Sequence, residues 1–174
     1  MREDFGHRLA IDSIGDGERV ELMADDAERL AVAQRLGLLS LQRLEAHATL
    51  RRNGAEVRAE GRIRAALEQS CIATGEPVAE HVDEAFDVKF VPAPDGVRAD
   101  EEIELDSDDC DIVFYDGSAI DLGESIADTL ALSLDSYPRS ADAESALKDA
   151  GVVSEAEAGP FAALAKLRFG KSKS

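Results

Sequence analysis

The sequence predicts an α+β fold, an antiparallel β-sheet that is a meander with an Asn-Gly hairpin and packs against one or two helices. Asn53 and Gly54 form a preferred two-residue hairpin turn, because both residue types tolerate positive φ. Apolar and polar residues alternate through 43–68 and again through 82–90, as in strands that bury one face. Asp121, with Glu124 three positions on, begins an amphipathic helix that we expect to cover that face.

Residues 1–20 show weak periodicity and several turn-forming residues, so we expect a loosely held N-terminal arm that includes a short strand. The α+β domain is expected to span 21–139. Asp25, followed by Glu28, has the spacing of a capping box, which predicts a helix over 26–36.

The hairpin turn also predicts the register of the two strands beside it. A type I′ turn at residues 53 and 54 places Arg52 opposite Ala55, and apolar residues then face each other along one side of the ribbon. A slip of one residue would carry the charged residues into the core, so we expect a well-specified register. The apolar pairs expected are Leu50 with Val57, Ala48 with Ala59, Ala46 with Gly61 and Leu44 with Ile63.

The third strand, over 82–90, is expected to end at a turn that begins with Pro92. Residues 92–111 form an acidic loop with too little apolar content to pack tightly. Residues 112–115 predict a short, largely buried strand before the helix that begins at Asp121.

The helix that begins at Asp121 should stop at Tyr137 and Pro138, because proline cannot continue a helix. Residues 140–174 are expected to form a variable tail with a basic end. Short helices are expected there at 141–150 and 160–169, set off by glycine and proline.

The composition favours one compact body with tails and a partner of opposite charge. The chain has 174 residues and a formal net charge of -18, which opposes nonspecific attraction to nucleic acid or to an anionic membrane. We find neither an apolar run long enough to span a membrane nor the pattern of a signal peptide, which predicts a cytoplasmic protein. Cys71 and Cys110 are expected to be free thiols.

Charge is distributed unevenly along the chain. Residues 95–128 hold 13 acids and one base, whereas residues 41–70 hold six bases and four acids, and residues 160–174 hold four bases and no acid. The simpler interpretation of the acidic segment 95–128 is a solvated loop. The simpler interpretation of the hairpin arginines is a solvated face of the sheet. A docking surface for a basic protein is compatible with that acidic loop.

The sequence favours neither catalysis nor a metal or cofactor site. The acidic run that includes Asp106 lacks the glycine and the final glutamate that an EF-hand loop requires. His7, His47 and His81 are the only histidines, and none stands close in sequence to a cysteine ligand or a nucleophile motif. We therefore expect no enzyme, no metal and no cofactor.

Two segments together resemble a known family. The residues at 69–78, Gln-Ser-Cys-Ile-Ala-Thr-Gly-Glu-Pro-Val, and at 120–132, Ile-Asp-Leu-Gly-Glu-Ser-Ile-Ala-Asp-Thr-Leu-Ala-Leu, resemble the two blocks of the bacterial YceD family, the large ribosomal RNA subunit accumulation proteins. The resemblance runs from about Glu21 to Arg139. Many relatives carry Cys-x-x-Cys in the first block, whereas Thr74 stands at the second cysteine position here. This departure argues against a zinc or redox role for Cys71.

The resemblance implies a non-enzymatic role in 23S rRNA accumulation and in assembly of the large ribosomal subunit. Two hypotheses for the mechanism remain open. In the first, acidic residues bind a basic ribosomal protein or assembly factor; in the second, arginines and the basic tail contact rRNA directly. The candidate protein-binding residues are Asp106, Asp108, Asp109 and Asp111, and the candidate RNA-binding residues are Arg58, Arg62, Arg64, Lys171 and Lys173.

Overall fold

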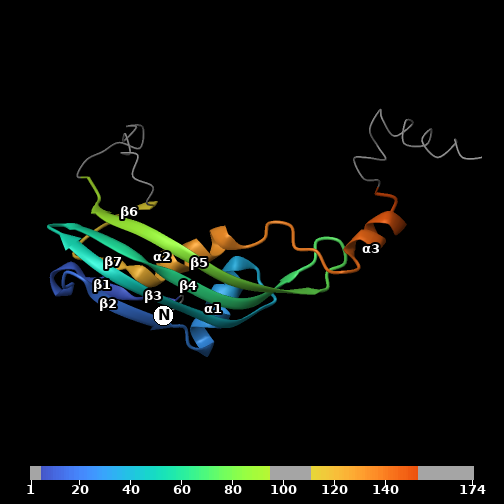
Figure 1. Ribbon diagram of the computed structural model, residues 1–174, viewed down its shortest axis with the longest axis horizontal. Helices are drawn as coiled ribbons and strands as arrows, with labels where there is room; N and C mark the ends of the chain where they lie inside the picture. Colours follow the sequence, from blue (N-terminus) through green and yellow to red (C-terminus); the bar gives the residue numbers. More distant parts are fainter. Residues whose placement is uncertain (1–4, 95–110, 153–174) are drawn as a thin grey trace, which may run out of the picture. The chain divides into compact units, whose positions relative to one another are not determined.

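A computed structural model describes residues 5–94 and 111–152 (Figure 1). The chain divides into two compact units, one of Met1–Gln69 with Ala79–Ser136 and one of Ser70–Val78 with Tyr137–Ser174. The predicted α+β class is confirmed. No helix among the described residues has the length and apolar character needed to cross a membrane.

The first unit contains a five-stranded sheet in the order β2-β3-β4-β5-β6 and a separate two-stranded sheet of β1 with β7. The pairs β2–β3 and β3–β4 are antiparallel, whereas the pair β5–β6 is parallel. The sheet is therefore mixed, whereas the sequence predicts an antiparallel sheet. The elements that lie wholly or mostly in this unit are β1 (Arg8–Ala10), a 3-10 turn (Ile11–Ser13), β2 (Glu18–Met23), α1 (Asp26–Leu36), β3 (Ser40–Asn53), β4 (Glu56–Ser70), β5 (Pro77–Pro92), β6 (Asp111–Tyr115), β7 (Ala119–Asp121) and α2 (Leu122–Ser133).

The β3–β4 hairpin exists, but its predicted register is wrong by two residues. Asn53 pairs with Glu56, so Gly54 and Ala55 form the turn, and only Gly54 has positive φ (63°). This pattern fits a type II′ turn with glycine at its first central position. Because the shift is an even number, every side chain keeps its predicted face. The observed pairs include Leu50 with Ala59, Ala48 with Gly61, Ala46 with Ile63 and Leu44 with Ala65.

This register requires glycine at residue 61, because β4 approaches β3 closely there. A Cβ atom at residue 61 would lie 1.9 Å from the carbonyl oxygen of His47, which no side chain can tolerate. Any residue but glycine would therefore push β4 away from β3 at this point. The observed register places the glycine of β4 opposite Ala48, at a position where a side chain has no room.

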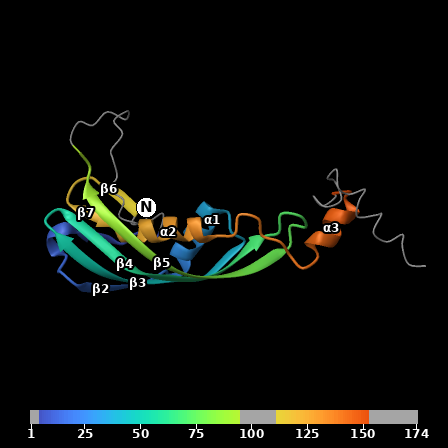
Figure 2. The same ribbon diagram turned by 45° about the horizontal axis from the view of Figure 1, so that its top comes forward.

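The core lies between the sheet and the helices α1 and α2, which Figure 2 shows against one face of the strands. Apolar residues of β3 and β4 such as Leu44, Leu50 and Ile63 are at most 1% exposed, as are Ile126 and Leu130 of α2. All five belong to one hydrophobic cluster. The predicted covering of the sheet by the helix after Asp121 is thus confirmed, and that helix ends at Ser133, before the predicted stop.

The predicted helix start of α1 is also confirmed. The Asp25 carboxylate accepts a hydrogen bond from the backbone N–H of Glu28, and the Glu28 carboxylate accepts one from the N–H of Asp25, both 2.9 Å long. This reciprocal capping box satisfies two N–H groups that the helix itself leaves without partners.

The N-terminal residues are part of the core, which corrects the expected loosely held arm. Phe5, Ile11 and Ile14 are buried. The backbone N–H of His7 donates to the Asp121 carboxylate at 3.0 Å, and β1 pairs with β7 with Arg8 opposite Asp121. Weak periodicity hid this packing, because the partners of His7, β1 and Ile11 are residues more than a hundred positions later.

β6 is more exposed than predicted. Phe114 is 47% exposed, and Ile112, Val113 and Tyr115 are only half-buried. The expectation of a largely buried strand is wrong because β6 lies at the end of the sheet and, among the described strands, has β5 as its single neighbour.

The second unit combines the turn after β4 with the chain after α2. The backbone N–H of Cys71 donates to the carbonyl oxygen of Glu76 at 2.8 Å and closes the turn, and that of Ile72 donates to Pro138 at 3.0 Å. α3 (Ala143–Asp149) follows, in agreement with the helix predicted over 141–150. The helix predicted over 160–169 lies outside the described residues.

Candidate functional site

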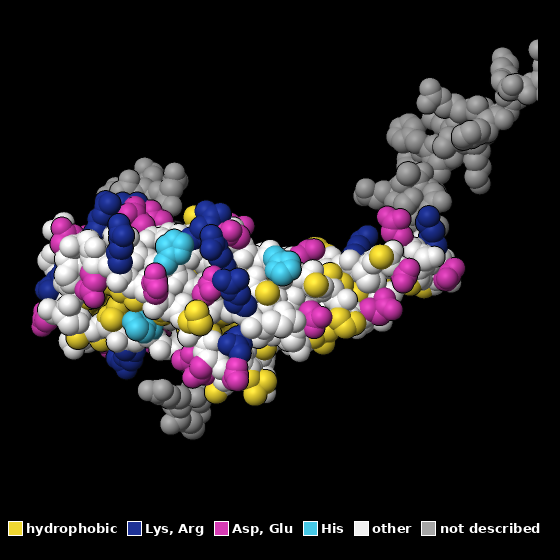
Figure 3. Space-filling view, turned by 60° about the horizontal axis from the view of Figure 1, so that its bottom comes forward, with side chains coloured by type: hydrophobic (Ala, Val, Ile, Leu, Met, Phe, Trp, Pro, Cys, Tyr) yellow, Lys and Arg dark blue, Asp and Glu magenta, His cyan; other side chains and the backbone are white. Residues whose placement is uncertain are grey.

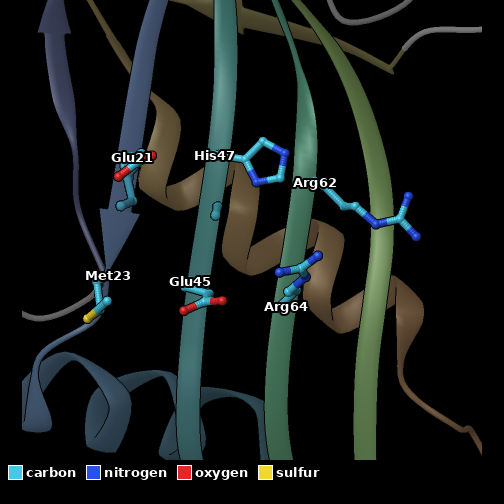
Figure 4. A pocket seen from close by; sticks show the side chains of 8 residues that line it. Glu21, Met23, Glu45, His47, Arg62 and Arg64 are labelled. Atoms are coloured by element: carbon cyan, nitrogen blue, oxygen red, sulfur yellow. The ribbon is translucent and has the colours of Figure 1, made fainter.

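Arg58, Arg62 and Arg64 occupy alternate positions of β4, so their side chains stand on the same face of the sheet. Figure 4 shows Arg62 and Arg64 on the side of the strands that is turned away from α2. The sequence-based placement of the three arginines on one outer face is confirmed. Their use in RNA binding stays a prediction.

These arginines are not a bare cationic patch, because β5 places carboxylates beside them. Nε of Arg58 donates to the Asp87 carboxylate at 2.8 Å, and Arg62 makes an ion pair with Asp83. Nε of Arg64 lies 3.6 Å from the same Asp83 carboxylate. The hydrogen bond from Arg62 lowers the pKa of Asp83, which keeps that carboxylate ionised.

Sequence analysis missed these carboxylates as partners of the arginines. The signal was available, since Asp83 and Asp87 alternate with the buried Val82, Phe86 and Val88 on the third strand. The polar face of β5 therefore had to lie beside that of β4. On the face seen in Figure 3, basic and acidic side chains are correspondingly intermixed.

A shallow hollow of about 390 Å³ lies on the same face of β2, β3 and β4 (Figure 4). Two arginines, two glutamates and a histidine line it, so its charge is nearly balanced and favours no single class of ligand. Within residues 5–94 and 111–152, no group of three or more His, Cys, Asp or Glu side chains is placed to hold a metal ion. The charged lining residues are Glu21, Glu45, His47, Arg62 and Arg64.

The candidate protein-binding carboxylates are only partly described. Asp111 is exposed and is the first residue of β6. Asp106, Asp108 and Asp109 lie outside the described residues, as do Lys171 and Lys173. Their proposed binding roles stay predictions.

Two other acids of the segment 95–128 have structural roles. The Asp121 carboxylate caps α2 by accepting from the N–H of Glu124 at 3.1 Å. The Asp128 carboxylate accepts a 2.6 Å hydrogen bond from the Arg35 guanidinium. Some of the negative charge of this segment therefore stabilises the fold, whatever the remaining acids bind.

Cys71 is buried, as expected of a small apolar residue after a strand, but its sulfur has polar neighbours. The backbone N–H of Ser140 donates to Sγ at 3.3 Å, and the Ser140 hydroxyl lies 3.5 Å from it. Oγ1 of Thr74 lies 3.2 Å from that hydroxyl. Hydrogen bonds from Ser140 and then Thr74 stabilise the thiolate and lower the pKa of Cys71 to about 6.

The first block of the family resemblance thus has a structural role in the second unit. Cys71, Thr74 and Glu76 form a turn that holds the chain at Pro138 and Ser140. Thr74 contributes a hydroxyl to this hydrogen-bond network.

Comparison with known proteins identifies one family. Residues 59–168, more than half of the chain, match the family described as large ribosomal RNA subunit accumulation protein YceD. No curated protein and no solved structure gave a significant match. The matched range contains β5, β6, α2 and the turn at Cys71. The chain therefore belongs to the YceD family of large ribosomal RNA subunit accumulation proteins.

Proposed function

We propose that this protein is a cytoplasmic, non-enzymatic factor that supports 23S rRNA accumulation and large-subunit assembly by binding a basic ribosomal protein or assembly factor. Family membership supports the role in large-subunit rRNA accumulation. The single observation that carries the choice of partner is the net charge of -18, most of which lies in the segment 95–128.

The charge acts on the partner by a simple mechanism. Proteins that bind rRNA carry lysines and arginines that neutralise phosphates, and such proteins also bind nucleic acid nonspecifically. An acidic surface that occupies those cations keeps the basic protein away from incorrect RNA sites until a correct site outcompetes it. Asp106, Asp108, Asp109 and Asp111 supply carboxylates for this role.

Direct rRNA binding is the second candidate, and the shared face of Arg58, Arg62 and Arg64 favours it. Lys171 and Lys173 would add cations from the tail. The carboxylates of β5 disfavour this hypothesis, because an RNA phosphate must compete with Asp87 for the guanidinium of Arg58 and with Asp83 for that of Arg62. Neither candidate requires a bound cofactor or metal.

Depletion of the protein in its native cell tests the function itself. We expect mature 23S rRNA to fall and its precursors to accumulate, and wild-type protein to restore both. A variant with Asp106, Asp108 and Asp109 each changed to Lys should restore neither and should recover less basic partner at moderate salt. A matched variant with the exposed Asp16, Glu84 and Asp149 changed to Lys carries the same charge change and should behave as wild type. Equal partner recovery by both variants would exclude the acidic segment.

The RNA alternative predicts a different result with purified components. The protein alone would bind large-subunit rRNA, with an affinity that falls steeply as salt rises. Arg62→Ala with Arg64→Ala would weaken that binding and flatten the salt dependence, by roughly one phosphate contact per arginine. Binding that is absent, or unaffected by the two substitutions, would exclude the arginine face.

A further inference from the structure

The outer edge of β6 lacks the lysine and proline residues that protect many edge strands. Its sequence, Asp-Ile-Val-Phe-Tyr, contains no lysine or proline, and its middle is entirely apolar. Natural edge strands usually carry such residues, because an unpaired row of backbone N–H and C=O groups is a template for another strand. Among the described strands, nothing pairs with the outer side of β6.

A groove of about 430 Å³ is lined by residues of β6, β7 and α2 together with Arg8, Phe90 and Asp116. Part of its lining is apolar. Val113 and Tyr115 are half-buried against the core, whereas Phe114, which alternates with them along the strand, is 47% exposed on the opposite face of β6. An exposed aromatic ring beside an unpaired strand edge suits a partner that supplies both a backbone and an apolar side chain.

The rest of the lining is mainly acidic. Asp116 and Glu124 are exposed, and Asp121 and Asp128 add two further carboxylates, against one cation, Arg8. The net charge of the lining is therefore negative even though Arg35 already pairs with Asp128. This charge favours a basic occupant and disfavours the acidic segment 95–110 of the chain itself.

We propose that the groove between β6 and α2 binds an extended basic segment of a partner protein, which adds a strand to the edge of β6. Its backbone would hydrogen-bond to β6, and its alternate side chains would lie on the two faces of the sheet: an apolar side chain would contact Phe114 on the outer face, and lysines or arginines would lie near Asp116 and Glu124 on the side of the groove. This inference rests on the proposed function, because it gives the basic partner a binding mode. Backbone pairing provides affinity in such complexes, and alternate side chains provide specificity.

A labelled synthetic peptide that alternates lysine and valine is the probe. Full-length protein should bind it, and should not bind a matched peptide that alternates glutamate and valine. Phe114→Ala should weaken binding by roughly ten-fold, and Asp116→Asn with Glu124→Gln by roughly two- to five-fold per charge. Leu132→Ala, at an 83% exposed position of α2 outside the groove, is the apolar control and should leave binding unchanged.

Hydrogen exchange locates the bound peptide. Backbone amides of residues 111–115 should exchange more slowly in the complex, since new hydrogen bonds form at the free edge, while amides of β2 at the other end of the sheet should not change. Equal binding of both peptides, protection elsewhere, or no effect of Phe114→Ala would overturn the proposal.

Two other occupants predict distinct results. If a second copy of the chain covers β6, the protein dimerises and Phe114→Ala makes it monomeric. If the chain's own basic tail fills the groove, Lys171→Glu with Lys173→Glu tightens binding of the probe. Either result would overturn the assignment of the groove to a separate partner.

Recovery of the native partner separates this inference from the proposed function. If reversal of Asp106, Asp108 and Asp109 lowers partner recovery but Phe114→Ala does not, the proposed function stands and the groove is excluded. If neither variant changes recovery, both proposals fall. Loss of recovery with Phe114→Ala, together with protection of β6, supports both.

Discussion

Asp121→Ala should destabilise the protein more than the loss of an ordinary helix cap. The Asp121 carboxylate accepts from the N–H of Glu124 at 3.1 Å and from the N–H of His7 at 3.0 Å, so it joins the start of α2 to the N-terminal segment. Loss of the cap costs about 1 kcal/mol. The partly buried His7 N–H left without its partner costs about 1–3 kcal/mol more. We therefore expect a loss of about 2–4 kcal/mol in the free energy of unfolding.

Asp25→Ala is the matched control, because Asp25 caps α1 through exposed, local hydrogen bonds alone. It should cost about 1 kcal/mol. Asp121→Asn keeps a side-chain oxygen as acceptor and should recover most of the lost stability.

Urea denaturation followed by circular dichroism measures all three variants. Asp121→Ala should also lower the melting temperature by at least about 4 °C, at roughly 2–4 °C per kcal/mol for a chain of this size. If Asp121→Ala costs no more than Asp25→Ala, the link from α2 to the N-terminal segment contributes nothing and the reasoning is wrong.

Two further predictions concern the sheet and the second unit. Gly61→Ala should lower the free energy of unfolding, measured by urea denaturation, by at least about 3 kcal/mol, because the new Cβ would meet the backbone of His47. Gly15→Ala is the control, since the nearest atom to its new Cβ is 3.8 Å away, and its stability should stay within about 0.5 kcal/mol of wild type. Similar losses for both variants would refute the close approach. With Cys110 changed to Ser, the remaining thiol, Cys71, should titrate near pH 6 by thiolate absorbance, and Ser140→Ala should raise that midpoint. The pKa of Cys71 is lower in the folded chain than in the unfolded chain, so the Cys71 thiolate stabilises the fold. This contribution is fully present above the unfolded pKa of about 8.5 and is lost as pH falls through about 6. A folded titration midpoint near 8.5 would contradict the hydrogen bonds from Ser140.

The hairpin illustrates how far local patterns reach. Alternation of apolar and polar residues correctly assigned each side chain of β3 and β4 to a face, because the two-residue period is a property of every strand. The register came out differently because the Asn-Gly pair admits more than one turn. The close approach at Gly61, seven residues beyond Gly54, belongs to the observed register, and the turn residues alone do not indicate it.

The candidate site shows the same division. The three arginines of β4 could be placed on one face from the sequence. The net charge of that face also depends on Asp83 and Asp87 of the next strand, which form ion pairs with two of the arginines. The groove beside β6 could not be anticipated, since it is formed by a parallel strand, β7 and α2, which no local pattern brings together.

The sequence by itself determined the class of fold, the faces of the long strands, the helix starts at Asp25 and Asp121, the excess of negative charge and the resemblance to the YceD family. The resemblance depends on the order of two sequence blocks, and each of the others depends on residues within a few positions of one another or on composition alone. Only the tertiary structure decided the register, the parallel pairing of β6, the burial of the N-terminal segment and the ion pairs across the sheet. These depend on which distant residues meet, and that is fixed by packing of the whole core rather than by any single segment.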